Sequence, residues 1–273
     1  MNGKNAYQKL SINNRYLVLV EYLILQLFYL ISYVLTLSLK EKVNTMKKAL
    51  FIILILSKLF IGNVLAHTDH YKNIKSIEME IFKDQKYIGY TNFKFKKEGK
   101  YFEVKSITDF KVKLMGINIF SIFSESLEKY EDDQLTYFKS ETKQNDKRKF
   151  VELFFDTSKN EFNINGSSFK GFADKNNIVG NWWNHKLLQS ESQISPLSGS
   201  IKPQTIEFIK RETIELYGEK IEVEKFKLKS KNPNTPKDKK LDFDIWYDKK
   251  RALIVKIAYK RLGDWEYRLK KVN

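Results

Sequence analysis

Most of the chain after residue 66 alternates between apolar and polar side chains with a period of two. Successive side chains of a strand point to opposite faces of a sheet, so this alternation predicts strands with one buried and one solvated face. In residues 102–114, one face would carry Phe102, Val104, Phe110, Val112 and Leu114, with Ser106 and Thr108 between them. A chain with this pattern buries its apolar residues by forming an extensive sheet.

The same alternation predicts an antiparallel meander at the end of the chain, formed by residues 241–248, 253–259 and 265–269. Further strands are predicted at residues 75–83, 87–97, 118–130, 134–143, 149–155, 161–164, 205–216 and 220–229. So many strands do not form a flat exposed sheet. We therefore expect a mostly β fold, a single strongly curved antiparallel sheet or partial barrel of about eleven strands that covers one short helix.

Three segments depart from the simple alternation. Residues 231–240 contain two prolines and four lysines and predict a solvated loop. Residues 181–190 have helical spacing, with Trp183, Leu187 and Leu188 near one face, and this short helix with the loop 193–203 is expected to cover the apolar face of the sheet. Residues 117–123 are apolar on both faces, which indicates either a central strand or the lip of a hydrophobic cavity.

Residues 46–66 have the three parts of a secretory signal peptide. Lys47 and Lys48 form a basic start, residues 49–56 are apolar, and Val64 and Ala66 are the small residues at positions −3 and −1 of a cleavage site. The mature protein would then be residues 67–273, a single exported β domain that begins at His67. Because it would lack disulfides, a periplasmic location is expected.

Residues 1–45 allow two interpretations. Either Met46 is the true initiator and the start of the gene was assigned too early, or residues 17–39 form an additional membrane helix. In the second case, the lysines that follow this helix keep the next loop in the cytoplasm, and the remainder of the chain again lies outside. Membrane contact is expected only through residues 1–66, if they are retained.

Composition excludes several classes of function. The chain has no cysteine, which rules out disulfides, thiolate chemistry, iron–sulfur clusters and a lipoprotein anchor. Residues 67–273 carry 41 basic and 31 acidic residues, a net charge of +10. Such a charge suits anionic lipid headgroups or polyanions, but single lysines scattered along strands more often form a solvated face. No nucleic-acid recognition module is present, so nucleic acid is not an expected partner.

The order of several motifs resembles a known family. The motifs are Val112-Lys113-Leu114-Met115-Gly116-Ile117, Ser124-Glu125-Ser126-Leu127-Glu128, Trp183-Asn184 with Leu187-Leu188, Ile245-Trp246-Tyr247-Asp248 and Glu266-Tyr267-Arg268-Leu269. This series resembles an uncharacterised family of exported proteobacterial proteins, domain of unknown function 6134, over essentially all of residues 67–273. The resemblance implies no catalytic residues. In general appearance it is also similar to periplasmic lipoprotein carriers, whose curved sheets wrap around a hydrophobic interior.

Three histidines are candidate metal ligands. The α-amino group of His67, the imidazoles of His67 and His70, and His185 as a distant partner would offer nitrogen ligands suited to copper. The alternative is an ordinary polar terminus without metal.

Catalytic signatures are weak. Asp242, Asp244 and Asp248 could serve acid–base chemistry, but alternation places them on the solvent face, where cross-strand ion pairs with lysines are expected. No Gly-x-Ser-x-Gly elbow or glycine-rich phosphate loop occurs. The sequence therefore predicts a non-catalytic protein without a cofactor.

Large apolar residues are candidate pocket residues for a lipid or another apolar small molecule. They are Ile117, Phe120, Phe123, Trp182, Trp183 and Trp246. The leading functional hypothesis is binding of a hydrophobic or lipid-like molecule in the concave face of the sheet. The alternatives are a cell-envelope interaction or structural module with a filled core, in which tandem tryptophans are core anchors, and the N-terminal metal site.

Overall fold

The computed structural model describes residues 22–30, 70–237 and 239–273. The chain divides into two compact units, residues 1–64 and 65–273. In the first unit, residues 22–30 are helical. No helix within the described ranges is long and apolar enough to cross a membrane. Most of the expected membrane helix at 17–39, the signal peptide at 46–66 and His67 lie outside the described residues, so these predictions stay predictions.

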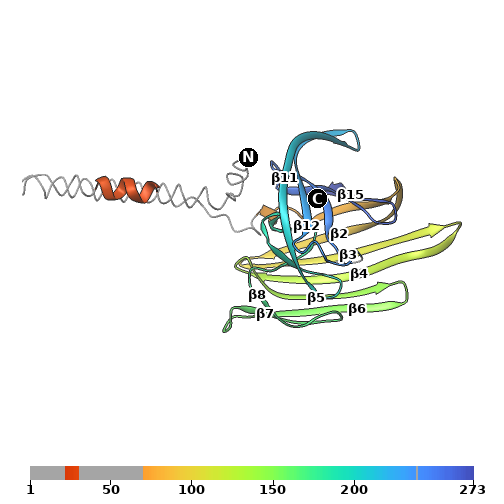
Figure 1. The fold of residues 1–273 in the computed structure, drawn as a ribbon, viewed down its shortest axis with the longest axis horizontal. Helices are drawn as coiled ribbons and strands as arrows, with labels where there is room; N and C mark the ends of the chain where they lie inside the picture. The colour runs from red at the N-terminus through yellow and green to blue at the C-terminus, as the bar shows by residue number, and fades with distance from the viewer. Residues whose placement is uncertain (1–21, 31–69, 238) are drawn as a thin grey trace, which may run out of the picture. The chain divides into compact units, whose positions relative to one another are not determined.

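The second unit is built on one sheet of fifteen strands, shown in Figure 1. The strands are β1 (Ser76–Lys83), β2 (Lys86–Glu98), β3 (Tyr101–Leu114), β4 (Ile117–Glu131), β5 (Gln134–Gln144), β6 (Lys147–Asp156), β7 (Glu161–Gly166), β8 (Lys170–Asp174), β9 (Ile178–Val179), β10 (Ser192–Ile194), β11 (Ile201–Leu216), β12 (Glu219–Ser230), β13 (Asp242–Asp248), β14 (Leu253–Lys260) and β15 (Asp264–Val272). Their spatial order is β8-β7-β6-β5-β4-β3-β2-β1-β15-β14-β13-β12-β11-β10-β9. The mostly β class and the single sheet are therefore confirmed.

Three finer expectations about the sheet are wrong. It has fifteen strands instead of about eleven, because β9 and β10 have only two and three residues and β8 carries its apolar residues Phe172 and Ala173 at adjacent positions. It is mixed instead of antiparallel, since β9 and β10 pair in parallel. It is also open and not strongly curled, with β8 and β9 at its two ends. Alternation predicts which face of the sheet a side chain occupies. Closure into a barrel instead requires the two edge strands to pair, and the edge strand β9 has only two residues for such pairing.

The C-terminal meander is confirmed, with β13, β14 and β15 pairing antiparallel in sequence order. The predicted ion pairs between lysines and Asp242 or Asp244 also form. Lys227 lies 2.7 Å from Asp242 and 2.8 Å from Asp244, and Lys225 lies 3.1 Å from Asp244. Asp248 differs from this expectation because it is buried and caps the β13–β14 turn, accepting hydrogen bonds from the backbone of Lys250 and Arg251.

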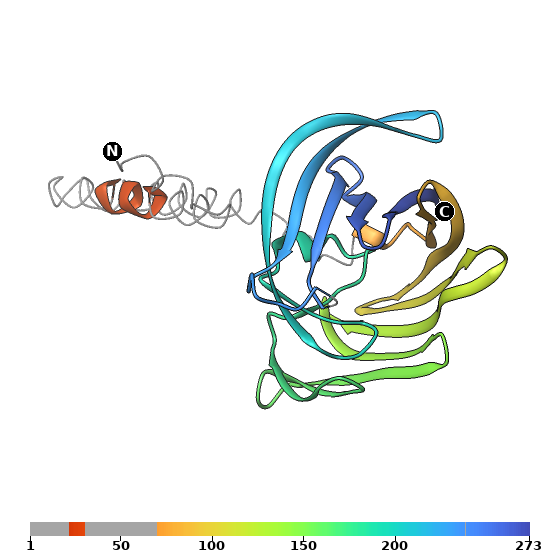
Figure 2. The same cartoon turned by 45° about the vertical axis from the view of Figure 1, so that its right-hand side comes forward.

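The segment 181–190 covers the inner face of the sheet, as expected. Its helical part is a 3-10 helix, η2 (His185–Gln189), whose first turn is capped by the Asn184 side chain. Trp183 contacts the rings of Phe95, Phe102 and Tyr130 on β2, β3 and β4, with centroids 5.6 to 5.9 Å apart. Trp182 contacts Phe243 on β13. The segment therefore packs between the two halves of the sheet, as Figure 2 shows for η2 (teal).

The buried residues form two apolar clusters. The larger cluster includes Phe102, Phe138, Trp183 and Ile245, and the smaller one is formed by Ile81, Phe110, Val112 and Trp265. A row of hydroxyl pairs crosses β2 to β5 between them, with oxygens 2.7 Å apart: Thr91–Thr108, Ser106–Ser126 and Ser124–Thr142. Each hydroxyl is thus satisfied by a cross-strand neighbour, as burial requires.

Candidate functional site

A buried carboxylate holds the covering segment on the sheet. Glu128 lies on the inner face of β4 and is 1% exposed. Its Oε1 accepts hydrogen bonds from Asn181 Nδ2 at 2.6 Å and Trp183 Nε1 at 2.8 Å, and its Oε2 accepts one from the Tyr130 hydroxyl at 2.6 Å. We call these four residues the Glu128 cluster. It joins β4 to a segment more than fifty residues later in the chain.

The electrostatics of this cluster follow from its burial. Removal from water disfavours the charged carboxylate and raises the pKa of Glu128, while the three hydrogen bonds oppose this shift. Burial likewise raises the pKa of the Tyr130 hydroxyl, and the nearby Glu128 carboxylate adds to this effect. Three donors of the cluster converge on the Glu128 carboxylate, so its geometry is that of a structural anchor.

Tyr71 and two histidines extend this polar network. The Tyr71 hydroxyl donates to the Trp183 carbonyl at 2.7 Å and lies 2.9 Å from His185 Nδ1. The rings of His70 and His185 are 5.8 Å apart in an edge-to-face arrangement. Burial and the neighbouring His70 lower the pKa of His185 to about 4. His185 is therefore neutral over most of the physiological range.

The structure brings two of the three candidate metal ligands together. His70 Nε2 lies 2.6 Å from the Arg251 carbonyl, and His185 contacts Tyr71, so a ring nitrogen of each histidine already has a protein partner. Within residues 70–237 and 239–273, no group of three His, Cys, Asp or Glu side chains is arranged to hold a metal ion. His67 lies outside the described residues, and the three-histidine site therefore stays a prediction.

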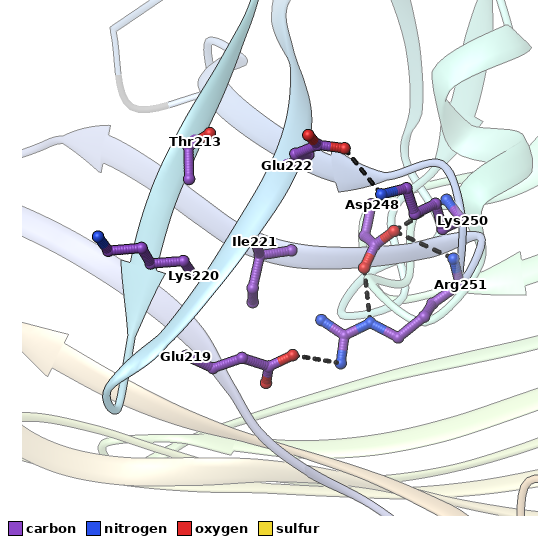
Figure 3. Close-up of a pocket in the computed structure, with 8 residues that line it drawn as sticks. All are labelled: Thr213, Glu219, Lys220, Ile221, Glu222, Asp248, Lys250 and Arg251. Carbon is purple, nitrogen blue, oxygen red and sulfur yellow. Dashed lines mark hydrogen bonds and ion pairs between the residues drawn. The ribbon is translucent and has the colours of Figure 1, made fainter.

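A polar depression of about 520 Å³ lies beside the β13–β14 turn, shown in Figure 3. Arg251 Nε binds Asp248 at 2.6 Å, its Nη1 lies 3.6 Å from Glu219, and Lys250 pairs with Glu222 at 2.8 Å. The eight lining residues are Thr213, Glu219, Lys220, Ile221, Glu222, Asp248, Lys250 and Arg251. Three basic and three acidic side chains balance one another there, so this depression does not favour a ligand of either charge.

The six candidate pocket residues lie in different parts of the structure. Trp183 is 1% exposed in the larger apolar cluster, and Trp182 packs against Phe243. Trp246 faces the other side of β13, where its Nε1 donates to Glu212 and Lys225 and Lys256 lie over its ring. The tandem tryptophans thus pack as core anchors.

The other three candidates lie near the β3–β4 hairpin. Phe120 packs against the smaller apolar cluster beside Phe110 and Trp265. Ile117 is 70% exposed and Phe123 is 43% exposed. Residues 117–123 are therefore not buried on both faces, but form the start of a hairpin arm that is partly open to solvent.

The Glu128 cluster was missed by sequence reasoning, although its signal is present. On β4, alternation places Ser124, Ser126, Glu128 and Tyr130 on the inner face, so a carboxylate occupies a core position. Such a residue needs buried donors. Those donors lie on the Asn181–Trp183 segment, and nothing local to β4 indicates this partner.

A comparison with protein-family models gives a match over residues 79–270 to a domain of unknown function, DUF6134. The chain belongs to the DUF6134 family. The matched region of this DUF6134 protein contains the whole Glu128 cluster and both turns of the C-terminal meander, whereas His70 and Tyr71 precede it. A search of curated proteins finds no match.

The DUF6134 domain also resembles a solved structure. A crystal structure described as a beta-barrel-like protein of domain of unknown function DUF1849 from Brucella abortus matches with a TM-score of 0.52 and 8% sequence identity. The match covers 73% of this chain and 97% of that one. At this identity, the similarity concerns the fold alone.

Proposed function

We propose that this protein is a non-catalytic interaction module of the cell envelope, exported through residues 46–66, whose core is filled by its own residues. The observation that carries this proposal is the position of the segment 181–190. Trp183 is buried between β2, β3 and β4, and its indole is fixed by the Glu128 carboxylate. The inner face of the sheet is therefore covered from within the chain.

The main rival is a carrier of a hydrophobic or lipid-like molecule. The expected similarity to lipoprotein carriers would place such a ligand on the inner face of the sheet, where Trp182 and Trp183 now pack. Admitting it would require breaking the two hydrogen bonds from Asn181 and Trp183 to a buried carboxylate. This cost supports the filled-core module over the carrier.

Native mass spectrometry distinguishes these functions. The protein is expressed from the full reading frame and recovered from the periplasm. We expect a bare mass that corresponds to residues 67–273. An additional few hundred daltons that are lost on denaturation would contradict the proposal and support the carrier. Additional mass of one copper ion would support the histidine site. Retention of residues 1–66 would contradict export by cleavage.

A further inference from the structure

Four neighbouring hairpin turns lie at one end of the sheet. The strands β6, β5, β4, β3, β2, β1, β15 and β14 are adjacent in this order, and their antiparallel pairing places the β1–β2, β3–β4, β5–β6 and β14–β15 turns at the same end. A direct contact joins two of them, since the Asp264 amide donates to Asp84 Oδ1 at 2.8 Å. We call residues 83–87, 111–117, 143–149 and 260–264 the basic end.

The β3–β4 hairpin extends beyond its neighbours. Pairing of β3 with β2 ends at Phe110, and pairing of β4 with β5 begins at Ile122. Between these positions β3 and β4 pair with each other, and Ser121 also exchanges hydrogen bonds with Asn145 of the β5–β6 turn. Figure 1 shows this hairpin (yellow) reaching further than the β5–β6 hairpin beside it (green). The smaller apolar cluster, with Phe110 and Trp265, packs beneath the base of the hairpin.

The apolar side chains at this end are exposed and stand on unfavourable backbone. Met115 is 96% exposed with φ +50°, and Leu262 is 93% exposed with φ +50°. Each precedes a glycine in a tight turn, where asparagine or aspartate is the preferred residue. Leu114 and Ile117, which flank the β3–β4 turn, are 59% and 70% exposed. Neither solubility nor turn geometry favours large apolar side chains at these neighbouring positions.

Charge is concentrated at the same end. The basic end holds three acidic residues, Asp84, Asp146 and Asp264, against ten basic residues: Lys83, Lys86, Lys111, Lys113, Lys143, Lys147, Arg148, Lys149, Lys260 and Arg261. Residues 96–101, 129–135, 154–161 and 248–253, which form the turns at the opposite strand ends, hold eight basic and seven acidic residues. Scattered lysines in the sequence thus become a polarised surface in the fold.

We propose that the basic end docks on an anionic lipid surface. The side chains of Met115, Ile117 and Leu262 enter the headgroup region, while the surrounding lysines and arginines contact lipid phosphates. A lipid interface accepts separate protruding apolar tips without a shaped pocket for each, and anionic headgroups complement the surplus of positive charge. This inference rests on the proposed function and names the partner of the interaction module. It places membrane contact on the folded domain in addition to residues 1–66.

Binding to vesicles tests the proposal. Residues 67–273 are used, because this range holds all the core residues and the apolar segments before it would bind lipid by themselves. We expect cosedimentation with equimolar phosphatidylcholine–phosphatidylglycerol vesicles, weaker binding at high salt, and little binding to phosphatidylcholine alone. Lys111→Glu with Lys113→Glu is expected to weaken binding more than about tenfold, and Met115→Ser with Ile117→Ser to weaken it independently of salt.

A matched control reverses two exposed charges at the opposite end, Lys96→Glu with Lys159→Glu, and is expected to leave binding unchanged. The proposal would be overturned if this control loses as much binding as the basic-end variant, or if the protein binds both vesicle types equally. It would also be overturned if the protein binds no vesicles, a result that would favour an acidic protein partner. Lipid retained in native mass spectrometry reports on the core, whereas vesicle binding reports on docking by the basic end. The two experiments therefore distinguish failure of the proposed function from failure of this inference.

The absence of cysteine allows a direct measurement of orientation. A polarity-sensitive fluorophore on Met115→Cys should shift to the blue on anionic vesicles, whereas one on Asp132→Cys, in the exposed β4–β5 turn, should not. A shift at position 132 alone would overturn the assigned orientation.

Discussion

Glu128 shows how one residue can determine the packing of a distant segment. Three donors from Tyr130, Asn181 and Trp183 converge on its carboxylate in a fully buried position. Leaving buried donors without an acceptor costs about 1–3 kcal/mol for each group. The residue is therefore more important to stability than the exposed carboxylates on the same strand.

Glu128→Ala is expected to lower the free energy of unfolding by about 3 kcal/mol or more, because it removes the acceptor of three buried donors. Glu128→Gln should retain most of the stability, since an amide can accept from Asn181 and Trp183 and donate to Tyr130. Urea unfolding of residues 67–273 measures both, with Glu125→Ala, an exposed glutamate on β4, as the control. An alanine variant as stable as this control would contradict the anchoring role.

His185 makes stability depend on pH. Its folded pKa of about 4 lies below the value of 6.5 expected in the unfolded chain, so the unfolded state binds the proton more readily. This contribution to stability is complete above pH 6.5 and is lost as the pH falls toward 4, by up to about 3 kcal/mol. His185→Gln should show a flatter fall of unfolding free energy over this range. Parallel curves for both proteins would contradict the assignment.

Among the elements, the β3–β4 hairpin combines a supported base with an unsupported tip. Its base belongs to the central strands, with Phe110 in the smaller apolar cluster, whereas Met115 at the tip is exposed and in the left-handed region. An isolated two-stranded ribbon is only marginally stable in water. We therefore attribute the apolar residues at the tip to contact with the proposed lipid partner and not to packing in the core.

Met115→Asn is expected to stabilise residues 67–273 by about 0.5 kcal/mol, because Asn-Gly suits a turn with positive φ at both positions. The same substitution should weaken vesicle binding. Thermal unfolding and cosedimentation measure the two effects. A control at a turn of the opposite end where an asparagine already holds a positive φ, Asn160→Gly, should change neither. Increased stability without loss of binding would show that Met115 does not contact lipid.

At the scale of the whole molecule, one open sheet carries regions of very different burial. The bases of β3 and β4 and the central strand β14 contribute many buried residues, whereas residues 207–213 of β11 are mostly exposed. Local opening is easiest where few apolar contacts hold the backbone.

Hydrogen exchange of residues 67–273 should therefore be slowest in 253–257 and in 102–110, and fast in 207–213 although these residues pair with β12. Mass spectrometry of peptic fragments resolves these regions. Equal protection of β11 and β14 would contradict the view that burial, and not strand pairing alone, sets local stability in this sheet.

The sequence by itself determined the features that depend on local periodicity. Alternation predicted most of the strands, the C-terminal meander, the faces of Asp242 and Asp244, and the covering segment 181–190, because period two and turn residues act between near neighbours. Only the tertiary structure decided the features that join distant positions. These are the Glu128–Trp183 contact, the short strands β8 to β10, the open edges of the sheet and the gathering of four basic turns at one end. They depend on strand order and register, which arise from long-range packing and which no local pattern encodes.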